Sequence, residues 1–285
     1  LSTHRSTVLT ADGDLPVAAT RLALAIDATA SPFGTTSPDA VAAWGKGEFQ
    51  KAIELDSGFG GAWLSWAQAS QPAEATAIAE RALANKGLRS DVDRARLTLL
   101  LATLRQDAPM RSRALADLVK LVPPDAATST AAAESEFNLR RFAEAAELFA
   151  QAVKLDPDNA NLLNLQGYAY AFAGNLEAAR KAFEEYAARP GQEANALDSL
   201  GEAYYLNGRF EEAEKQFQAS YAKDPNMNGG LALSKAAYAR LLRRDAAGAD
   251  QLHAQFAKAR KKAKDPSIIL RDAMWWYSTG RRDRA

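Results

Sequence analysis

Cysteine and histidine, whose side chains often perform catalysis or bind metals, are scarce in this sequence. Cysteine is absent, which excludes disulfides, thiolate catalysis and cysteine-based zinc sites. The two histidines, His4 and His253, have no cluster of carboxylates around them in the sequence, as a metal site or a general base would need. We therefore predict no metal site, no catalytic residue and no enzymatic activity, and we expect both histidines to be ordinary surface or half-buried side chains.

Three short segments resemble parts of phosphate or calcium sites. Gly58-Phe59-Gly60-Gly61 precedes a helical pattern, but it lacks the strand, the spacing and the lysine of a phosphate-binding loop. Asp12-Gly13-Asp14 and the segment 156–159 lack the alternating oxygen ligands and the distal glutamate of a calcium loop. Turns and helix caps account for all three, so the sequence predicts no cofactor.

The densest basic run could contact phosphate groups. It consists of Lys258, Arg260, Lys261, Lys262 and Lys264. Interleaved aromatic residues, which stack on bases, are missing there, and a basic run near a helix C-terminus also suits the helix dipole. We therefore interpret it as a solvated face, and binding to nucleic acid or anionic lipid is disfavoured.

Composition is ordinary for a soluble globular protein: 285 residues, 47% hydrophobic and 25% charged. No apolar run approaches the ~18 residues that span a bilayer, and no signal sequence opens the chain. Charge is unevenly distributed, because residues 126–230 hold 9 basic and 16 acidic side chains whereas 231–285 hold 13 and 5. The chain begins with Leu1 rather than Met, and we expect a processed or trimmed fragment that extends beyond Leu1 or Ala285 in nature.

One pattern recurs at a spacing of 34 residues. Leu163-x2-Gln166-Gly167-x2-Tyr170 returns as Leu197-x2-Leu200-Gly201-x2-Tyr204, and Tyr238 lies one period further on. A second pattern keeps the same period: Ala145-x3-Phe149 with Pro157, Ala179-x3-Phe183 with Pro190, and Ala213-x3-Phe217 with Pro225. Glycine inside a helix costs about 1 kcal/mol relative to alanine, so Gly167 and Gly201 predict close helix crossings.

These patterns over 126–225 resemble the tetratricopeptide repeat, in a bacterial-type form. The resemblance implies an all-α fold, a right-handed α-solenoid of antiparallel helix pairs that form a tetratricopeptide-like superhelix. Each pair buries its apolar stripe only by stacking on its neighbours. It also implies a bacterial protein, of the cytoplasm or the periplasm.

Outside that block the repeat is weaker. We predict an N-terminal helix at 14–27 and a linker at 28–36 within a segment 1–36, degenerate pairs over 37–125, and repeats over 126–285 of which the last is incomplete. Residues 38–55 form either one helix or a compressed pair. The last helix contains Trp275 and Trp276 and lacks its partner helix, so we predict that one of them packs back on 252–256 and the other points toward the vacant position, where copies of the chain can associate.

In a tetratricopeptide superhelix the first helices of successive units line a concave groove, and register carries its positions onto this chain. They are Asn161, Asn164, Tyr168 and Phe172 in one unit, Asn195, Asp198, Glu202 and Tyr205 in the next, and Tyr238 beyond. Amides and aromatic rings suit an extended peptide. The alternative is structural: Asn161 and Asn195 begin helices, and Tyr168 packs between them.

The resemblance therefore implies a non-catalytic protein-interaction scaffold that binds a peptide or protein segment in this groove. The basic clamp with which some family members hold a C-terminal carboxylate is not matched, because Asp198 and Glu202 are negative. The alternative function is a sensor domain that binds a small molecule or an anion in the groove or at the basic C-terminal face.

Overall fold

The computed structural model describes residues 15–26 and 33–284, and within them the regular structure is sixteen α-helices and two short 3-10 helices, without a strand. The predicted all-α fold is thereby confirmed. The chain divides into two compact units, residues 1–124 and 125–285. Most of the predicted linker, together with His4 and Asp12-Gly13-Asp14, lies outside the described residues, and the separation of 1–36 as a domain stays a proposal.

The first unit contains seven helices. They are α1 (Leu15–Ile26), α2 (Pro38–Gly45), α3 (Phe49–Leu55), α4 (Gly60–Ala69), α5 (Pro72–Ala84), α6 (Asp91–Leu104) and α7 (Ala108–Leu121). The segment 38–55 is thus a compressed pair, and Gly47 between its helices has a φ of +78°, a conformation that glycine adopts without strain. Buried Trp63, Ile78 and Leu97 join α4, α5 and α6 into one core.

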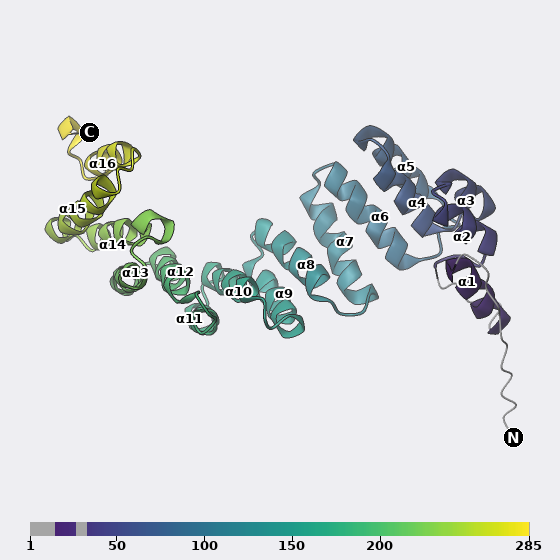
Figure 1. The fold of residues 1–285 in the computed structure, drawn as a ribbon, viewed down its shortest axis with the longest axis horizontal. Coiled ribbons are helices and arrows are strands. Elements are labelled where there is room, and N and C mark those ends of the chain that lie inside the picture. The colour runs from purple at the N-terminus through teal and green to yellow at the C-terminus, as the bar shows by residue number, and fades with distance from the viewer. Residues whose placement is uncertain (1–14, 27–32, 285) are drawn as a thin grey trace, which may run out of the picture. The chain divides into compact units, whose positions relative to one another are not determined.

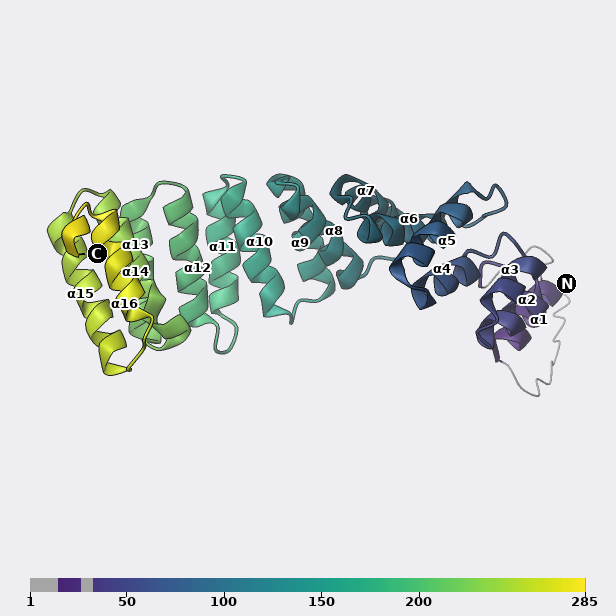
Figure 2. The same ribbon diagram turned by 90° about the horizontal axis from the view of Figure 1, so that it is seen from above.

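The second unit is a row of helix pairs. Its helices are α8 (Ala126–Asn138), α9 (Phe142–Leu155), α10 (Ala160–Phe172), α11 (Leu176–Ala187), α12 (Glu193–Leu206), α13 (Phe210–Lys223), α14 (Leu231–Leu242), α15 (Ala246–Lys262) and α16 (Ile268–Ser278). Neighbouring helices of this unit lie side by side in chain order (Figures 1 and 2). Within it, α10, α12, α14 and α16 follow the inner side of a curve, with α11, α13 and α15 outside (Figure 1).

Close helix crossings hold each pair of the clear repeats together. A Cβ built on Gly167 would lie 2.6 Å from the ring of Phe183, and one on Gly201 would lie 2.6 Å from the ring of Phe217. Both distances are well inside van der Waals contact, so the two phenylalanines occupy the space that a side chain would need. The sequence-based explanation of the two helical glycines is confirmed, and Phe183 and Phe217 are buried as a result.

A second periodic feature is a residue in a left-handed conformation that follows each of the helices α6, α8, α10, α12, α14 and α16. It is Gln106, Arg140, Gly174, Gly208, Arg244 and Gly280, with φ values of 54°, 60°, 78°, 74°, 65° and 78°. Their spacing is 34 residues through Gly208 and 36 thereafter. The repeat register therefore extends beyond the glycines that mark it in the sequence, back to α6 and forward to α16.

Replacing Arg244 by glycine should stabilise the protein. A left-handed conformation costs an L-residue about 1–2 kcal/mol, and the larger chain entropy that glycine gives the unfolded state offsets about 0.5–1 kcal/mol of that gain. We expect urea unfolding to give Arg244→Gly up to about 1 kcal/mol more stability. Lys258→Gly, inside α15 and also exposed, should instead lose about 1 kcal/mol. A loss in both variants would contradict the argument.

Candidate functional site

The nine residues predicted for the groove all lie on first helices, on α10, α12 and α14, and α10 packs directly against α12. Asn161 and Phe172 are exposed, Asp198 is buried, and the other six are half-buried: Asn164, Tyr168, Asn195, Glu202, Tyr205 and Tyr238. They do not form one continuous site. Apart from Asn161 and Asn164, they divide into side chains that pack the repeat, side chains of a polar network and side chains that line a pocket.

The packing group includes Phe172 and Asn195. The Phe172 ring lies 5.0 Å from that of Phe142 and 5.5 Å from that of Phe137, in an aromatic cluster of α8, α9 and α10. The Asn195 amide donates to the hydroxyl of Tyr186 over 2.8 Å. These contacts join neighbouring helices, so both side chains have a structural role, while Phe172 stays 43% exposed.

A polar network crosses from α10 to α14. The Tyr168 hydroxyl lies 2.6 Å from Glu202 Oε2, to which it donates, and 3.1 Å from Ser199 Oγ. Lys235 Nζ donates to Asp198 Oδ2 over 2.6 Å and also to Glu202 Oε1. Two carboxylates thus share one ammonium, which leaves a net charge of −1.

Burial changes the pKa of three groups of this network. It raises the pKa of Asp198, and it raises the pKa of Tyr168 far above its ordinary value, with help from the Glu202 carboxylate. Burial by itself lowers the pKa of Lys235, but its bonds to Asp198 and Glu202 outweigh that effect and hold this pKa above its ordinary value. The lysine is therefore an ammonium, and the tyrosine is a donor and not a phenolate, throughout the neutral range.

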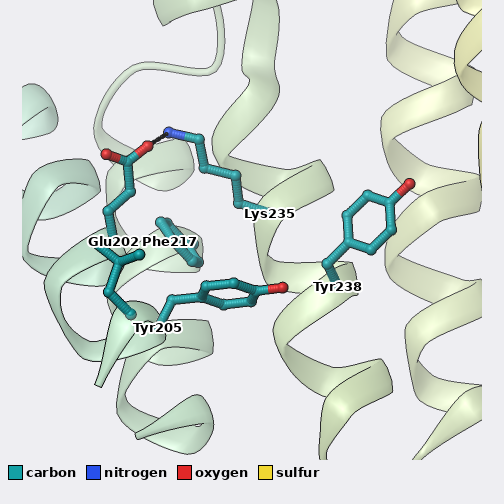
Figure 3. A pocket seen from close by; sticks show the side chains of 6 residues that line it. Glu202, Tyr205, Phe217, Lys235 and Tyr238 are labelled. Atoms are coloured by element: carbon teal, nitrogen blue, oxygen red, sulfur yellow. Dashed lines mark hydrogen bonds and ion pairs between the residues drawn. The ribbon is translucent and has the colours of Figure 1, made fainter. Parts of the chain in front are cut away.

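Beside this network lies a pocket of about 330 Å³. It is lined by Glu202, Tyr205, Leu206, Phe217, Lys235 and Tyr238. In Figure 3 the Tyr205 ring extends toward Tyr238, Phe217 lies behind it, and the Lys235–Glu202 ion pair is at one side. Aromatic and aliphatic surface forms most of the wall, with charge at one edge only. The pocket can bury an apolar group, and it has no nucleophile aligned with a base.

Three of the lining residues were predicted and three were missed. Glu202, Tyr205 and Tyr238 come from the repeat register, whereas Leu206, Phe217 and Lys235 do not. Lys235 precedes Tyr238 by three residues, which places the two on one face of α14, and this spacing was the available signal. Phe217 serves both the helix crossing at Gly201 and the pocket wall.

Two side chains of the basic C-terminal run form ion pairs. Arg260 Nε donates to Asp265 over 2.8 Å, and Lys261 Nζ lies 3.0 Å from Asp272. Lys258, Lys262 and Lys264 are exposed. Across the described part of the chain, no group of three or more His, Asp or Glu is placed to hold a metal. Over the same residues, no helix is both long and apolar enough to cross a bilayer.

The two C-terminal tryptophans have different surroundings, as predicted. Trp275 is fully buried against α15: its ring stacks on His253 at 4.6 Å, and its Nε1 donates to Asp250 over 2.9 Å. Trp276 is half-buried, but Arg281 and Arg284 lie over its ring, so it is covered where we expected it to face a vacant position. The exposed apolar side chains of α16 are Ile269, Leu270, Met274 and Tyr277. Self-association through this end stays a prediction.

His253 is buried rather than a surface residue and should make stability depend on pH. Burial lowers its pKa, against the effects of Asp272 (3.0 Å from Nε2) and Asp250, while Lys261 adds to the lowering. The unfolded chain therefore binds a proton at His253 more readily than the folded chain does. The stability that neutral His253 contributes to the fold is complete above about pH 6.5 and is lost as pH falls from there through the folded pKa.

We expect the melting temperature to fall between about pH 7.5 and about pH 5.5, and to fall less in His253→Phe, which keeps a ring against Trp275. His4→Gln should retain the whole decrease. An equal decrease in His253→Phe and the parent would assign the pH dependence to other groups.

The comparisons with known proteins agree with this architecture. The tetratricopeptide repeat model matches residues 130–194 and 166–228. No curated protein matches the sequence. Among solved structures, YrrB, described as a TPR protein with an unusual peptide-binding site, is 17% identical, with 65% of this chain and 95% of that one covered and a TM-score of 0.52.

Two further solved structures are similar. The C-terminal part of a TPR repeat-containing protein from Cytophaga hutchinsonii is 16% identical, with 74% of this chain and 85% of that one covered and a TM-score of 0.50. MamA is 19% identical, with 61% and 95% covered and a TM-score of 0.49.

Stacked helix pairs, close glycine crossings and an inner row of first helices define an α-solenoid repeat protein. The family model specifies the kind of repeat over 130–228: these residues match the tetratricopeptide repeat. Proteins of this class are typically non-catalytic scaffolds for protein–protein interaction.

Proposed function

We propose that this protein is a non-catalytic scaffold that binds a peptide or protein segment along the inner face of α10, α12 and α14. The observation that carries the proposal is the pocket between Tyr205 and Tyr238, because it leaves aromatic surface open on the inner face of a repeat fold. Its volume of about 330 Å³ is at the lower end of the ~300–1,000 Å³ that small-molecule sites span. One large side chain of a bound segment is therefore a better match than a whole drug-sized ligand.

Aromatic side chains in such pockets are frequent hot spots of binding. We expect the double variant Tyr205→Ala, Tyr238→Ala to lower the affinity for the physiological partner about 30-fold or more. This factor corresponds to a loss of about 2 kcal/mol of binding free energy. The partner would be captured from the source organism, purified, and titrated against each variant by calorimetry. Asn195 should be left unchanged, because its amide supports Tyr186.

The matched control is Glu184→Ala with Lys215→Ala, two exposed side chains on the outer helices α11 and α13. It should bind like the parent. If the control lost as much affinity as the inner-face variant, the inner face would not be the binding surface. Circular dichroism melting of both variants separates lost binding from lost folding.

The alternative, a sensor for a small anion, has less support. The ammonium of Lys235 is the one cation among the pocket-lining residues, and two carboxylates already accept its hydrogen bonds. The C-terminal arginine and lysine that are paired with Asp265 and Asp272 are likewise occupied. A free anion in the pocket would have to displace one of the two carboxylates from Lys235.

A further inference from the structure

Negative charge dominates the inner helices of the second unit. Helices α8, α10 and α12 together contain five carboxylates, Glu134, Glu136, Glu193, Asp198 and Glu202, and no lysine or arginine. At the pocket, α14 adds Lys235, which lies between Asp198 and Glu202 and also over the ring of Phe217 at 5.6 Å. The charged edge of the pocket is therefore one ammonium against two carboxylates.

An acidic ligand group would meet a cation that is already satisfied. To bind it, Lys235 would have to release Asp198, which is only 5% exposed and would then be a buried carboxylate without a counter-charge. Removing the partner of a buried charge is strongly unfavourable, because the charge cannot recover its water. The pocket thus discriminates against Asp, Glu and a free C-terminal carboxylate.

A basic ligand group would instead be attracted to the charged edge of the pocket. It would bring the local net charge from −1 to zero, and the Glu202 side chain, 34% exposed, can be reached from solvent. The rings of Tyr205 and Tyr238 present negative faces, which attract ammonium and guanidinium groups. The apolar wall made by Leu206 and Phe217 offers no carboxylate to such a charge and suits an uncharged side chain instead.

We infer that the segment bound on this inner face carries a large aliphatic or aromatic side chain, which fills the pocket, next to a lysine or arginine, which pairs with Glu202. The inference rests on the proposed function and adds the chemistry of its partner. The occupant is a basic, apolar peptide segment of another protein.

The experiment is a selection of phage-displayed random dodecapeptides on the full 285-residue chain. We expect enriched peptides to contain Leu, Phe or Trp beside Lys or Arg. The strongest peptide is then synthesised, and its dissociation constant is measured by fluorescence polarisation against the parent, Tyr205→Ala, Glu202→Gln and Glu185→Gln. A copy of the peptide with its basic residue replaced by Glu is measured against the parent.

Expected results are a loss of tenfold or more for Tyr205→Ala and of about fivefold to tenfold for Glu202→Gln. The control Glu185→Gln, an exposed carboxylate on α11, should bind like the parent, and the Glu-substituted peptide should bind worst. The peptide comparison uses the parent protein alone. It therefore tests the preference for a basic over an acidic residue even if Glu202→Gln is unstable.

The outcomes separate the two proposals. Peptides that depend on Tyr205 but are acidic, or bind Glu202→Gln as well as the parent, would overturn the basic-segment inference and leave the inner-face function standing. Peptides insensitive to Tyr205→Ala, or no enrichment at all, would overturn both.

Discussion

Gly201→Leu is expected to destabilise the second unit by about 3 kcal/mol, the upper part of the range for overpacking a core. The reason is geometric: a Cβ at this position would lie 2.6 Å from the Phe217 ring, and Phe217 is buried between α12 and its neighbours. The larger side chain must therefore push α12 away from α13. Urea unfolding followed by circular dichroism measures the change.

Two variants test the cause. Ala222→Leu places the same side chain on the exposed surface of α13 and should change stability by less than about 0.5 kcal/mol. Phe217→Ala in the Gly201→Leu background should recover part of the loss, since it vacates the contested space. A melting curve of Gly201→Leu that coincides with the parent's would show that the crossing is not as close as the structure has it.

Trp275→Ala should cost about 3–5 kcal/mol, as large aromatic truncations in cores do. Its ring is fully buried, stacks on His253 with an angle of 7° between the planes, and meets Tyr238 edge-on at 5.1 Å. Because α16 is attached to the rest of the unit mainly through α15, we expect the loss to appear first as faster amide hydrogen exchange in α16.

Trp276→Ala serves as the comparison, since that ring is half-buried under Arg281 and Arg284. It should cost clearly less than Trp275→Ala. Similar exchange rates in the two variants would mean that α16 is held by something other than Trp275. Tyr238 also lines the pocket, so Trp275→Ala should loosen one pocket wall, an effect that Trp276→Ala lacks.

Local sequence signals were sufficient for the repeat and its crossings but not for the site. Glycine inside a helix destabilises that helix. Its presence at Gly167 and Gly201 therefore indicated that another helix packs closely there. Gln106, Arg140 and Arg244 hold the same left-handed position as Gly174 and Gly208, yet no residue type marks them. The register was therefore visible only where glycine filled that position.

The repeat period predicted only part of the pocket. Tyr205 and Tyr238 followed from the register, but the partner of Asp198 and Glu202 depends on how closely α14 approaches α12, and periodicity carries no information on that distance. The sequence showed only that Asp198 and Glu202 are negative, whereas in the structure Lys235 neutralises one of them. Phe172 and Asn195 have the expected position but contact side chains of the preceding repeats, Phe142 and Tyr186.

The regular spacing of the left-handed residues also affects how such a chain can change in length. Every step from Gln106 to Gly208 spans 34 residues and returns the backbone to the same conformation at the same point of the repeat. A duplication or deletion in the gene that spans one step would join equivalent ends, so helix lengths and the neighbouring interfaces would be preserved. The number of repeats can therefore vary in evolution by whole units, and a change confined to the steps before Gly174 would leave the pocket between α12 and α14 intact.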